Sequence, residues 1–145
     1  MSKLSIIIRP ATQDDETIIK AMIKREHLDP IGLDWENFLI AEVDNHIAGI
    51  GQIKPHIGCE ELGSLVTNPE FQGQGVGRTM ISALEARAGR PLYLKCLAKM
   101  EPYYEKFGYQ TIPWWQAPSI FKLIGLMMMT ARLFGVEGRI MRKDA

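Results

Sequence analysis

The chain contains 145 residues, 46% of them hydrophobic, which is enough apolar side chain for one buried core and predicts a single domain over residues 1–145. Its 17 Lys and Arg residues equal its 17 Asp and Glu residues, and this zero net charge argues against a nucleic-acid partner, because no overall field attracts a polyanion. Cys59 and Cys96 form no CxxC pair and the histidines no cluster, so we expect neither a disulfide framework nor a metal site, and a cytoplasmic setting.

The N-terminal segments predict a strand followed by a helix. Leu4–Arg9 is short and rich in isoleucine, and Pro10 closes it because proline lacks the amide that a strand ladder needs. The segment has neither the long apolar stretch nor the cleavage site of a signal peptide. After Thr12, which can cap a helix, apolar residues recur at helical spacing up to Ile23.

The middle of the chain predicts a hairpin, a further strand, a helix and another strand. Asp44-Asn45 joins two β-rich runs, which is typical of a tight turn between antiparallel strands. A glycine-rich turn later separates a strand from a helix with one apolar face. The expected strands are Phe38–Val43, Ile47–Ile53, Glu60–Val66 and Leu92–Leu97, and the expected helix runs from about Gly75 to Ala88.

The C-terminal third predicts a short helix, a strand, an insertion and a last strand. Glu101-Pro102 opens the short helix, which stops at Gly108, and Tyr109–Ile112 is the strand after it. Arg139–Lys143 is the expected last strand. Strands therefore precede, flank and follow helices, which predicts an α/β or α+β class with a mixed sheet.

The insertion, at about residues 113–138, contains a strongly apolar helix. Ser119–Phe134 carries Lys122 and Arg132 as its charged residues, and it is shorter than the roughly 20 residues that span a bilayer, so we expect no transmembrane segment. The helix is expected to pack on the sheet or on another subunit, which would make a homodimer. A peripheral membrane contact also stays open.

The segment Pro69–Arg78 has the features of an anion-binding turn. It lies between a predicted strand and a predicted helix, where unpaired backbone amides and the helix dipole suit a pyrophosphate. Gly73, Gly75 and Gly77 let the backbone approach phosphates without a Cβ in the way. The spacing is not GxGxxG, and no Gly-Lys-Ser/Thr follows as in a P-loop. The alternative is an ordinary glycine-rich loop without a ligand.

Two motifs of this chain resemble signatures of the GNAT superfamily of acyl-CoA-dependent N-acyltransferases. Gln72-x-x-Gly75-x-Gly77 resembles the family's Q/R-x-x-G-x-G/A pyrophosphate signature. Tyr104–Tyr109 resembles the family's Y-E-x-x-G-F/Y ending and follows across one predicted strand, in the family's order. In element order the resemblance covers roughly residues 5–112.

The resemblance implies the GNAT fold: a mixed, mainly antiparallel central sheet with helices on both faces and two splayed central strands, ending near Val66 and Leu97. It also implies acetyl-CoA as cosubstrate and no metal, with the pantetheine arm on main-chain groups of Leu65 and Val66. The amides that would hold the pyrophosphate are those of Gln72, Gly73, Gln74, Gly75, Val76, Gly77 and Arg78. Family members often carry Asn where this chain has Leu97, so the resemblance implies no side-chain contact to pantetheine there.

The resemblance further implies the groups that transfer protons. Tyr104 occupies the position of a tyrosine that protonates the CoA sulfur in many GNAT enzymes, so it is the candidate general acid, with Tyr103 as the alternative. Glu61 lies eleven positions before Gln72, where several members carry a glutamate that deprotonates the amine directly or through water, so it is the candidate base. Glu60 is adjacent, but alternate strand residues face opposite sides, so only one of the two can face the cleft.

The predicted function is transfer of an acetyl group from acetyl-CoA to a primary amine by direct attack in a ternary complex. The acceptor, a small molecule or a protein amine, is expected to be shaped by the loop Arg25–Trp35 and the insertion. His27, His46 and His56 have no partner at metal or triad spacing, although His56 could border the cleft. The alternatives are a catalytically inactive acyl-CoA-binding sensor or interaction module, and a structural protein that assembles through its apolar helix.

Overall fold

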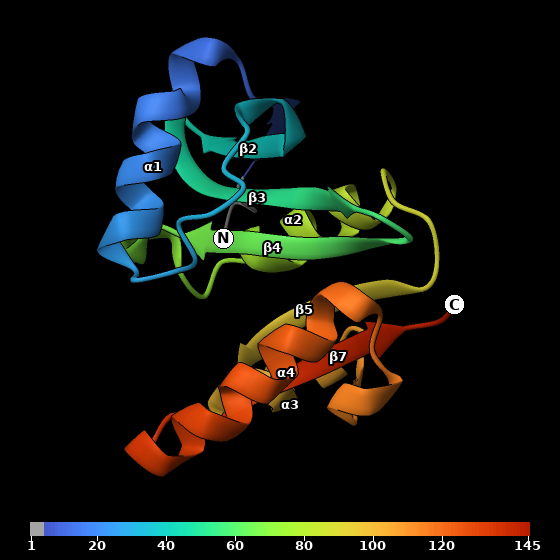
Figure 1. Cartoon of the computed structure of the whole chain (residues 1–145). Coiled ribbons are helices and arrows are strands. Elements are labelled where there is room, and N and C mark those ends of the chain that lie inside the picture. The colour runs from blue at the N-terminus through green and yellow to red at the C-terminus, as the bar shows by residue number, and fades with distance from the viewer. Residues whose placement is uncertain (1–4) are drawn as a thin grey trace. The chain divides into compact units, whose positions relative to one another are not determined.

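The computed structural model describes residues 5–145, in which strands and helices intermix (Figure 1). The strands within these residues form one seven-stranded sheet in the order β1-β2-β3-β4-β5-β7-β6. They are β1 Ile6–Pro10, β2 Phe38–Val43, β3 His46–His56, β4 Cys59–Thr67, β5 Leu92–Leu97, β6 Gln110–Ile112 and β7 Gly138–Lys143. The helices are α1 Glu16–Arg25, α2 Val76–Glu85, α3 Glu101–Glu105 and α4 Ser119–Ala131.

Most neighbouring strands of the sheet run antiparallel. β1 pairs with β2, β2 with β3, β5 with β7 and β6 with β7 in this way. β4 and β5 are parallel, and their pairing joins Glu60 to Leu92 and Glu61 to Tyr93, at the start of both strands. This arrangement confirms the mixed, mainly antiparallel sheet that the sequence predicts.

The residues of the chain group into two compact parts. The first part contains residues 5–54 and 62–88, and the second contains residues 55–61 and 89–145. The first part holds β1, β2, α1, α2 and most of β3 and β4, while the second holds β5, β6, β7, α3 and α4. Each part has a hydrophobic core of its own.

In the first part, α1 and α2 cover opposite faces of the sheet. The core on the α1 side consists of Ala11, Ile19, Met22, Ile23, Phe38, Ile40, Ile50 and Val66. Because side chains alternate along a strand, Gly49 and Gly51 of β3 face away from Ile50. A Cβ on Gly51 would lie 2.8 Å from Leu84 of α2, so the missing side chain lets this helix pack closely behind β3 and β4 (Figure 1). The expected helices on both faces are therefore present in this part.

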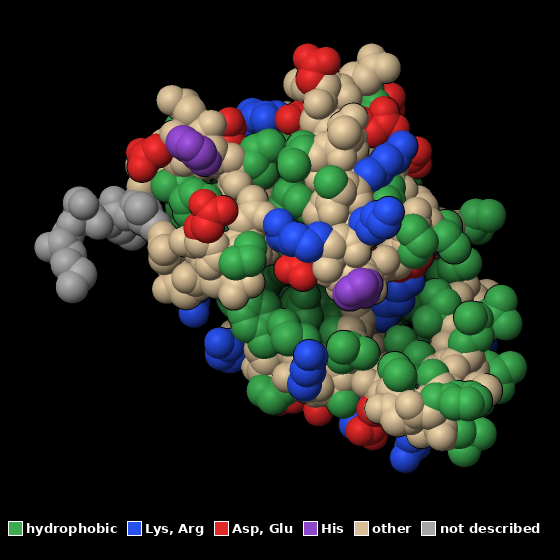
Figure 2. Space-filling model, turned by 90° about the vertical axis from the view of Figure 1, so that its left-hand side faces the viewer, with side chains coloured by type: hydrophobic (Ala, Val, Ile, Leu, Met, Phe, Trp, Pro, Cys, Tyr) green, Lys and Arg blue, Asp and Glu red, His purple; other side chains and the backbone are tan. Residues whose placement is uncertain are grey.

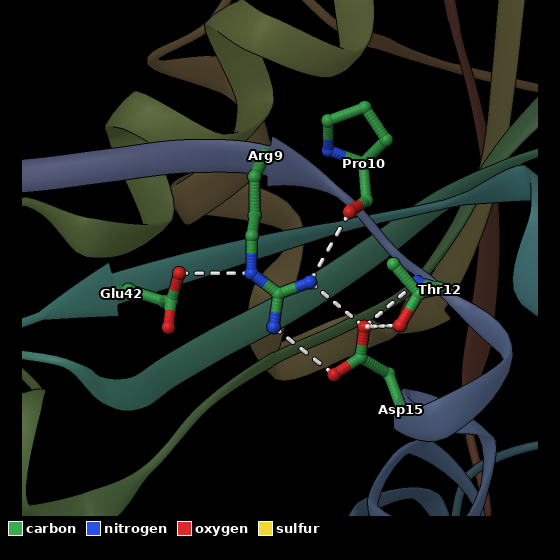
Figure 3. A network of polar contacts seen from close by, with 5 residues as sticks. All are labelled: Arg9, Pro10, Thr12, Asp15 and Glu42. Carbon is green, nitrogen blue, oxygen red and sulfur yellow. Dashed lines mark hydrogen bonds and ion pairs between the residues drawn. The ribbon is translucent and has the colours of Figure 1, made fainter.

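A charged network fastens the start of α1 to the edge of the sheet (Figure 3). Arg9 of β1 donates from Nε to Glu42 Oε1 of β2 at 2.8 Å, and from Nη1 and Nη2 to the two carboxylate oxygens of Asp15 at 2.8 and 3.0 Å. The Thr12 amide donates to the same Asp15 carboxylate at 2.7 Å. The hydrogen bonds from Arg9, and then those from Thr12, lower the pKa of Asp15 to about 2 although burial opposes the change.

This network predicts a stability loss that depends on pH. Because the Asp15 pKa is about 2 in the folded chain and 3.8 ordinarily, its stabilisation is present above pH 3.8 and is lost as the pH falls towards 2. Asp15→Asn should therefore lower the free energy of unfolding at pH 7 by about 2 kcal/mol, and wild type and variant should converge in acid. Urea unfolding at several pH values measures the difference.

A matched control is Glu16→Gln, one residue further along. Glu16 forms an exposed pair with Lys20 at 2.7 Å, and exposed pairs of this kind contribute at most about 0.5 kcal/mol. An Asp15→Asn effect no larger than that of Glu16→Gln, or one that persists at pH 2, would contradict the structural role given to the network.

In the second part, α4 packs one face against β5 and β7. Phe121 of α4 is fully buried, and its ring stacks on that of Tyr93 with 5.7 Å between centroids. The buried cluster consists of Tyr93, Ile112, Ala117, Phe121 and Ile140. A side chain on Gly125 would collide with Trp114, so glycine permits the close approach of the helix that Figure 1 shows in front of β7.

Some bounds differ from the predicted ones. β3 continues to His56 rather than ending at Ile53, and the buried donors of its polar residues have partners: Gln52 Nε2 and Lys54 Nζ donate to carbonyls of a neighbouring loop at 3.1 and 2.8 Å. The α-helical part of the insertion ends at Ala131 and gives way to a 3-10 turn, Arg132–Phe134. α2 ends at Glu85, three residues early, and Leu4 of the predicted first strand lies outside the described residues. Across residues 5–145 no helix combines the length and the apolar character that crossing a membrane requires.

Candidate active site

The turn that was predicted to bind phosphate connects β4 to α2 in the first part. Gly73 and Gly75 have φ angles of +76° and +87°, a left-handed conformation that residues with a Cβ rarely adopt. A Cβ at either position would meet nothing within 4 Å, so glycine serves the backbone conformation here and leaves the space beside it open. Asn68 fixes the base of the turn, because its amide donates to Ala48 O at 2.8 Å and its Nδ2 to Ile47 O at 2.7 Å.

The first turn of α2 offers the groups that an anion needs. Gly75 is the N-cap and provides no side-chain cap, and the first turn contains no acidic residue. The amides of Val76 and Gly77 have no acceptor within the helix, because the residues four positions earlier lie outside it. Both these amides and the positive end of the helix dipole favour the same kind of ligand, a phosphate or another anion.

The two glutamines of the turn direct their side chains back to its backbone. Gln72 Nε2 donates to Thr67 O at 3.3 Å, and Gln74 Nε2 donates to Glu70 O at 3.2 Å. The side chains of both glutamines therefore stabilise the turn, and the group of each residue that is left for a ligand is its backbone amide. Arg78, the last residue of the predicted set, lies in the first turn of α2.

Leu65 and Val66 lie near the end of β4, directly after a strained residue. Ser64 has a φ of +53°, which is uncommon for a residue with a side chain and costs about 1–3 kcal/mol. Its Oγ accepts a hydrogen bond of 2.8 Å from Gln52 Nε2, and this bond helps to hold the conformation. Such strain concentrates at functional sites. Nothing in the local sequence signals it, because serine is compatible with an ordinary strand.

Glu61 is the most enclosed acidic side chain among the candidates. Its side chain is only 2% exposed, and both of its oxygens have basic partners within the second part. His56 Nε2 lies 2.8 Å from Oε1, and Lys95 Nζ lies 3.7 Å from Oε2. Because a buried carboxylate is costly unless it is paired, this cluster explains how an acid can be kept inside the sheet.

His56 has a partner in space that its spacing in the sequence did not indicate, the carboxylate of Glu61. His56 ends β3 and Glu61 lies early in β4, and these neighbouring strands are joined by only two residues, Ile57 and Gly58. The imidazole also meets the Phe121 ring edge-on, with 5.9 Å between centroids. Glu60 points elsewhere, as strand alternation requires, and accepts a hydrogen bond from the Gly89 amide at 2.9 Å.

Tyr104 lies on the short helix α3, which ends at Glu105 and leads to Gly108 with a φ of +91°. Its ring meets those of Tyr103 and Tyr109 edge-on, at centroid distances of 5.2 and 6.2 Å. Burial is the main cause that raises the pKa of the Tyr104 hydroxyl, and Cys96 and Tyr103 add to the effect. The hydroxyl therefore keeps its proton throughout the neutral range and can act as a donor.

The two cysteines carry protonated thiols. Burial is the main cause that raises the pKa of Cys96 to about 11, with a contribution from Glu101 and an opposing one from Arg139. Burial also raises the pKa of Cys59, with contributions from Glu61 and Glu60. Since the thiolate is the reactive form, neither side chain has the character of a nucleophile.

The predicted site residues divide between the two parts. Leu65, Val66 and the turn belong to the first part, whereas Glu61 and Tyr104 belong to the second. Within the second part, Glu61 contacts Lys95 of β5, while Tyr104 interacts with Cys96, whose side chain faces the other side of that strand. The contacts of the described residues include none between Tyr104 and Glu61. Residues 5–145 also contain no group of three or more His, Cys, Asp or Glu side chains arranged to hold a metal ion.

Comparison with solved structures identifies the fold. N-acetylglutamate synthase from Neisseria gonorrhoeae, complexed with coenzyme A and N-acetyl-glutamate, matches with a TM-score of 0.77 and 20% identity over 99% of this chain and 36% of its own. Rv2747 from Mycobacterium tuberculosis, in complex with CoA, matches with a TM-score of 0.77 and 13% identity over 96% of this chain and 99% of its own. An acyl-CoA N-acyltransferase from Pseudomonas aeruginosa matches with a TM-score of 0.66 and 17% identity over 97% and 99% of the two chains. The present chain thus spans about a third of the synthase.

Comparison with sequence families gives the same result. None of the curated proteins compared with this chain matches it. The acetyltransferase (GNAT) domain matches residues 34–111, which are more than half of the chain and include the turn before α2 and the Tyr104–Tyr109 motif. The chain therefore belongs to the GNAT acetyltransferase family.

Proposed function

We propose that this chain transfers an acetyl group from acetyl-CoA to a primary amine, by direct attack of the amine on the thioester in a ternary complex. The observation that carries the proposal is the turn before α2, where two left-handed glycines and a helix N-terminus without a side-chain cap leave amides directed at an anion. Membership of the GNAT family supports an acyl-CoA as the ligand whose pyrophosphate is that anion. A direct attack needs no covalent nucleophile, and both cysteines have raised pKa values.

Acetyl-CoA is proposed to bind mainly through the backbone. The pyrophosphate would be held by the amides of Gln72, Gly73, Gln74, Gly75, Val76, Gly77 and Arg78. Main-chain groups of Leu65 and Val66 would pair with the pantetheine arm, as an added strand pairs with an exposed edge. Ser64 would set the path of the backbone for this pairing through its left-handed conformation.

Tyr104 is proposed to protonate the departing thiolate of CoA. The phenolic hydroxyl carries a proton at neutral pH, and the position of Tyr104 in the family motif supports the role; burial raises the pKa of this hydroxyl, which makes it a weaker acid. Transfer of the phenolic proton to the sulfur would produce neutral CoA thiol, and solvent would restore the proton to Tyr104. Tyr103, on the same helix, is the alternative donor.

Glu61 is proposed to take up the proton that the amine loses. Its carboxylate is too enclosed to meet a substrate directly, so the proton would reach it through His56, which lies 2.8 Å away, or through water. The side chain of His56 is 22% exposed against 2% for Glu61, which makes the imidazole the more accessible end of the pair. Lys95 Nζ lies 3.7 Å from the other carboxylate oxygen of Glu61.

The activity itself is tested by screening primary amines for acetyl-CoA-dependent release of CoA. Amino acids, polyamines, aminoglycosides and peptide amines cover the main classes of acceptor. Turnover with at least one of them is expected. Binding of acetyl-CoA without turnover on any amine would favour the alternative, a catalytically inactive acyl-CoA-binding module.

The cofactor site predicts a specific effect of Gly75→Val. Acetyl-CoA at about a hundredfold over its Kd should stabilise the wild type by about 2.7 kcal/mol. A β-branched side chain would stand where the phosphates approach, so the variant should lose this gain. It should also lose about 1–2 kcal/mol of stability without ligand, because the left-handed conformation strains any residue with a Cβ. Thermal unfolding with and without acetyl-CoA measures both effects.

Gly135→Val is the matched control for that experiment. Gly135 has a φ of +81°, similar to the +87° of Gly75, and a Cβ there also meets nothing within 4 Å. The control should suffer the same strain and still be stabilised fully by acetyl-CoA. Equal stabilisation of the two variants by acetyl-CoA would show that the cofactor does not bind at the turn before α2.

The role of Tyr104 predicts a separation of turnover from binding. Tyr104→Phe keeps the ring contacts with Tyr103 and Tyr109 and removes only the hydroxyl, so kcat should fall by about 10² to 10⁴ while the Kd of acetyl-CoA changes little. Tyr103→Phe is the control and should retain turnover. If only Tyr103→Phe loses turnover, Tyr103 is the general acid. If both variants keep full activity, water protonates the departing thiolate.

The pair of Glu61 and His56 predicts non-additive kinetics. Glu61→Gln and His56→Gln should each lower kcat by about 10² or more, and the double variant should lose little beyond either one, because both act on the same proton. Glu60→Gln, which changes the neighbouring acid, should leave kcat unaffected. Effects that multiply in the double variant would show that the two residues act separately. Circular dichroism of each variant checks that the buried pair can be changed without unfolding.

A further inference from the structure

The largest exposed apolar feature of the second part is one face of α4 together with Trp115 before the helix and the segment from Leu133 to Val136 after it. The side chains of this apolar face, with their exposed fractions, are Trp115 62%, Ile120 44%, Leu123 65%, Leu126 53%, Met127 63%, Met129 50%, Leu133 83%, Phe134 82% and Val136 49%. Figure 2 shows hydrophobic side chains gathered over the lower right of the molecule, where α4 lies. A soluble surface normally scatters such residues singly.

The opposite face of α4 holds the helix in place. Phe121 and Gly125 are buried, and Ile124 and Met128 pack against the core of the second part. Met128 packs closely on β7, since a Cβ added to Gly138 of that strand would lie 2.9 Å from Met128 Sδ. One side of α4 thus packs against the core of the second part, and the apolar face on its other side is exposed to solvent. Met128, despite its place in the methionine run, is not part of that face.

The area of the apolar face is large enough for a docking surface. Nine side chains, most of them at least half exposed, present an area on the order of the ~800 Å² that one partner contributes to a standard interface. The largest apolar patch on a typical monomer is only about 300–600 Å². The face therefore has an area that isolated surface residues do not explain.

The charges within the segment that carries the apolar face have one sign, and the acid that follows it, the exposed Glu137, is paired with Arg139 at 3.2 Å. From Gln110 to Val136 the sequence contains no Asp or Glu, and its charged residues are Lys122 and Arg132, both exposed. A surface that is apolar with a basic margin is complementary to a layer that is apolar inside and anionic outside. If a second copy covered the face, cations of one helix would lie beside cations of the other, with no acid in the segment to offset them.

We propose that the apolar face of α4 docks on an anionic lipid surface, with the helix lying in the plane of the interface. Leu133 and Phe134 at one end and Trp115 at the other would enter the boundary between headgroups and acyl chains, where aromatic side chains are favoured. Lys122 and Arg132 would meet the anionic headgroups. The attachment is peripheral and reversible, because one amphipathic surface with two cations gives modest affinity.

The test is co-sedimentation of the intact chain with vesicles of phosphatidylcholine and phosphatidylglycerol, and with vesicles of phosphatidylcholine alone. The wild type should bind the anionic vesicles more tightly. Leu133→Ser and Phe134→Ser should each weaken binding by about tenfold, because each removes a side chain that enters the lipid. Lys122→Gln and Arg132→Gln should each weaken binding by about fivefold on anionic vesicles and have no effect on neutral ones.

Ile57→Ser is the matched control. Ile57 is 101% exposed, lies in the turn between β3 and β4, and loses the same kind of side chain without belonging to the apolar face. It should bind anionic vesicles like the wild type. All these residues are exposed, so the variants should keep the wild-type melting temperature.

Three results would overturn the proposal. The first is a lipid-free dimer in sedimentation equilibrium that Leu133→Ser converts to a monomer, since the face would then be covered by a second copy. The second is a monomer that sediments with neither kind of vesicle. The third is binding that Ile57→Ser weakens as much as Leu133→Ser does, since the contact would then be unspecific.

Discussion

The alternation of side chains along β3 decides what each side of the first part can hold. On one side Gly49 and Gly51 leave no side chain, and α2 packs against the bare backbone. On the other side Ile50 enters the core under α1, and Gln52 and Lys54 follow it at every second position. Because the two polar side chains are almost fully buried, they need partners, and they find them in backbone carbonyls of Gly32 and Ile31.

These two hydrogen bonds give the loop between α1 and β2 a fixed position. Lys54 Nζ also lies 3.6 Å from Asp29 Oδ2, so the loop is held by a charge as well as by its carbonyls. This is the loop that is expected to shape the acceptor site. A buried lysine and glutamine below it make its backbone part of the packed structure, and a change of acceptor would have to come from its outward-facing side chains.

The sequence was sufficient for features that depend on local chemistry. Asp44 and Asn45 predict a tight hairpin turn, and both adopt positive φ angles, 50° and 64°. The glycine pattern drew attention to the turn before α2, where Gly73 and Gly75 adopt the left-handed conformation. The order of helices and strands was also predictable, since apolar periodicity survives in each element.

The features that could not be predicted from the sequence depend on contacts between strands or between packed elements. The pairing of His56 with Glu61 requires β3 to continue three residues past Ile53, its last apolar residue. The sequence does not indicate this extension, because polar residues such as Gln52 and Lys54 interrupt the apolar pattern of the strand. The strained Ser64 has no signature because its conformation is imposed by its neighbours. For the same reason the apolar residues of 119–134 looked equivalent in sequence, and only packing separates Met128, which faces the core, from Met127.

The protonated state of the two thiols has a practical consequence for this chain. Release of CoA is commonly followed with disulfide reagents, which react with thiolates far faster than with thiols. Cys59 and Cys96 both have raised pKa values, so at neutral pH the protein competes weakly with free CoA for such a reagent. The proposed acetyl transfer could therefore be followed through the product thiol on the unmodified chain, with both cysteines left in place.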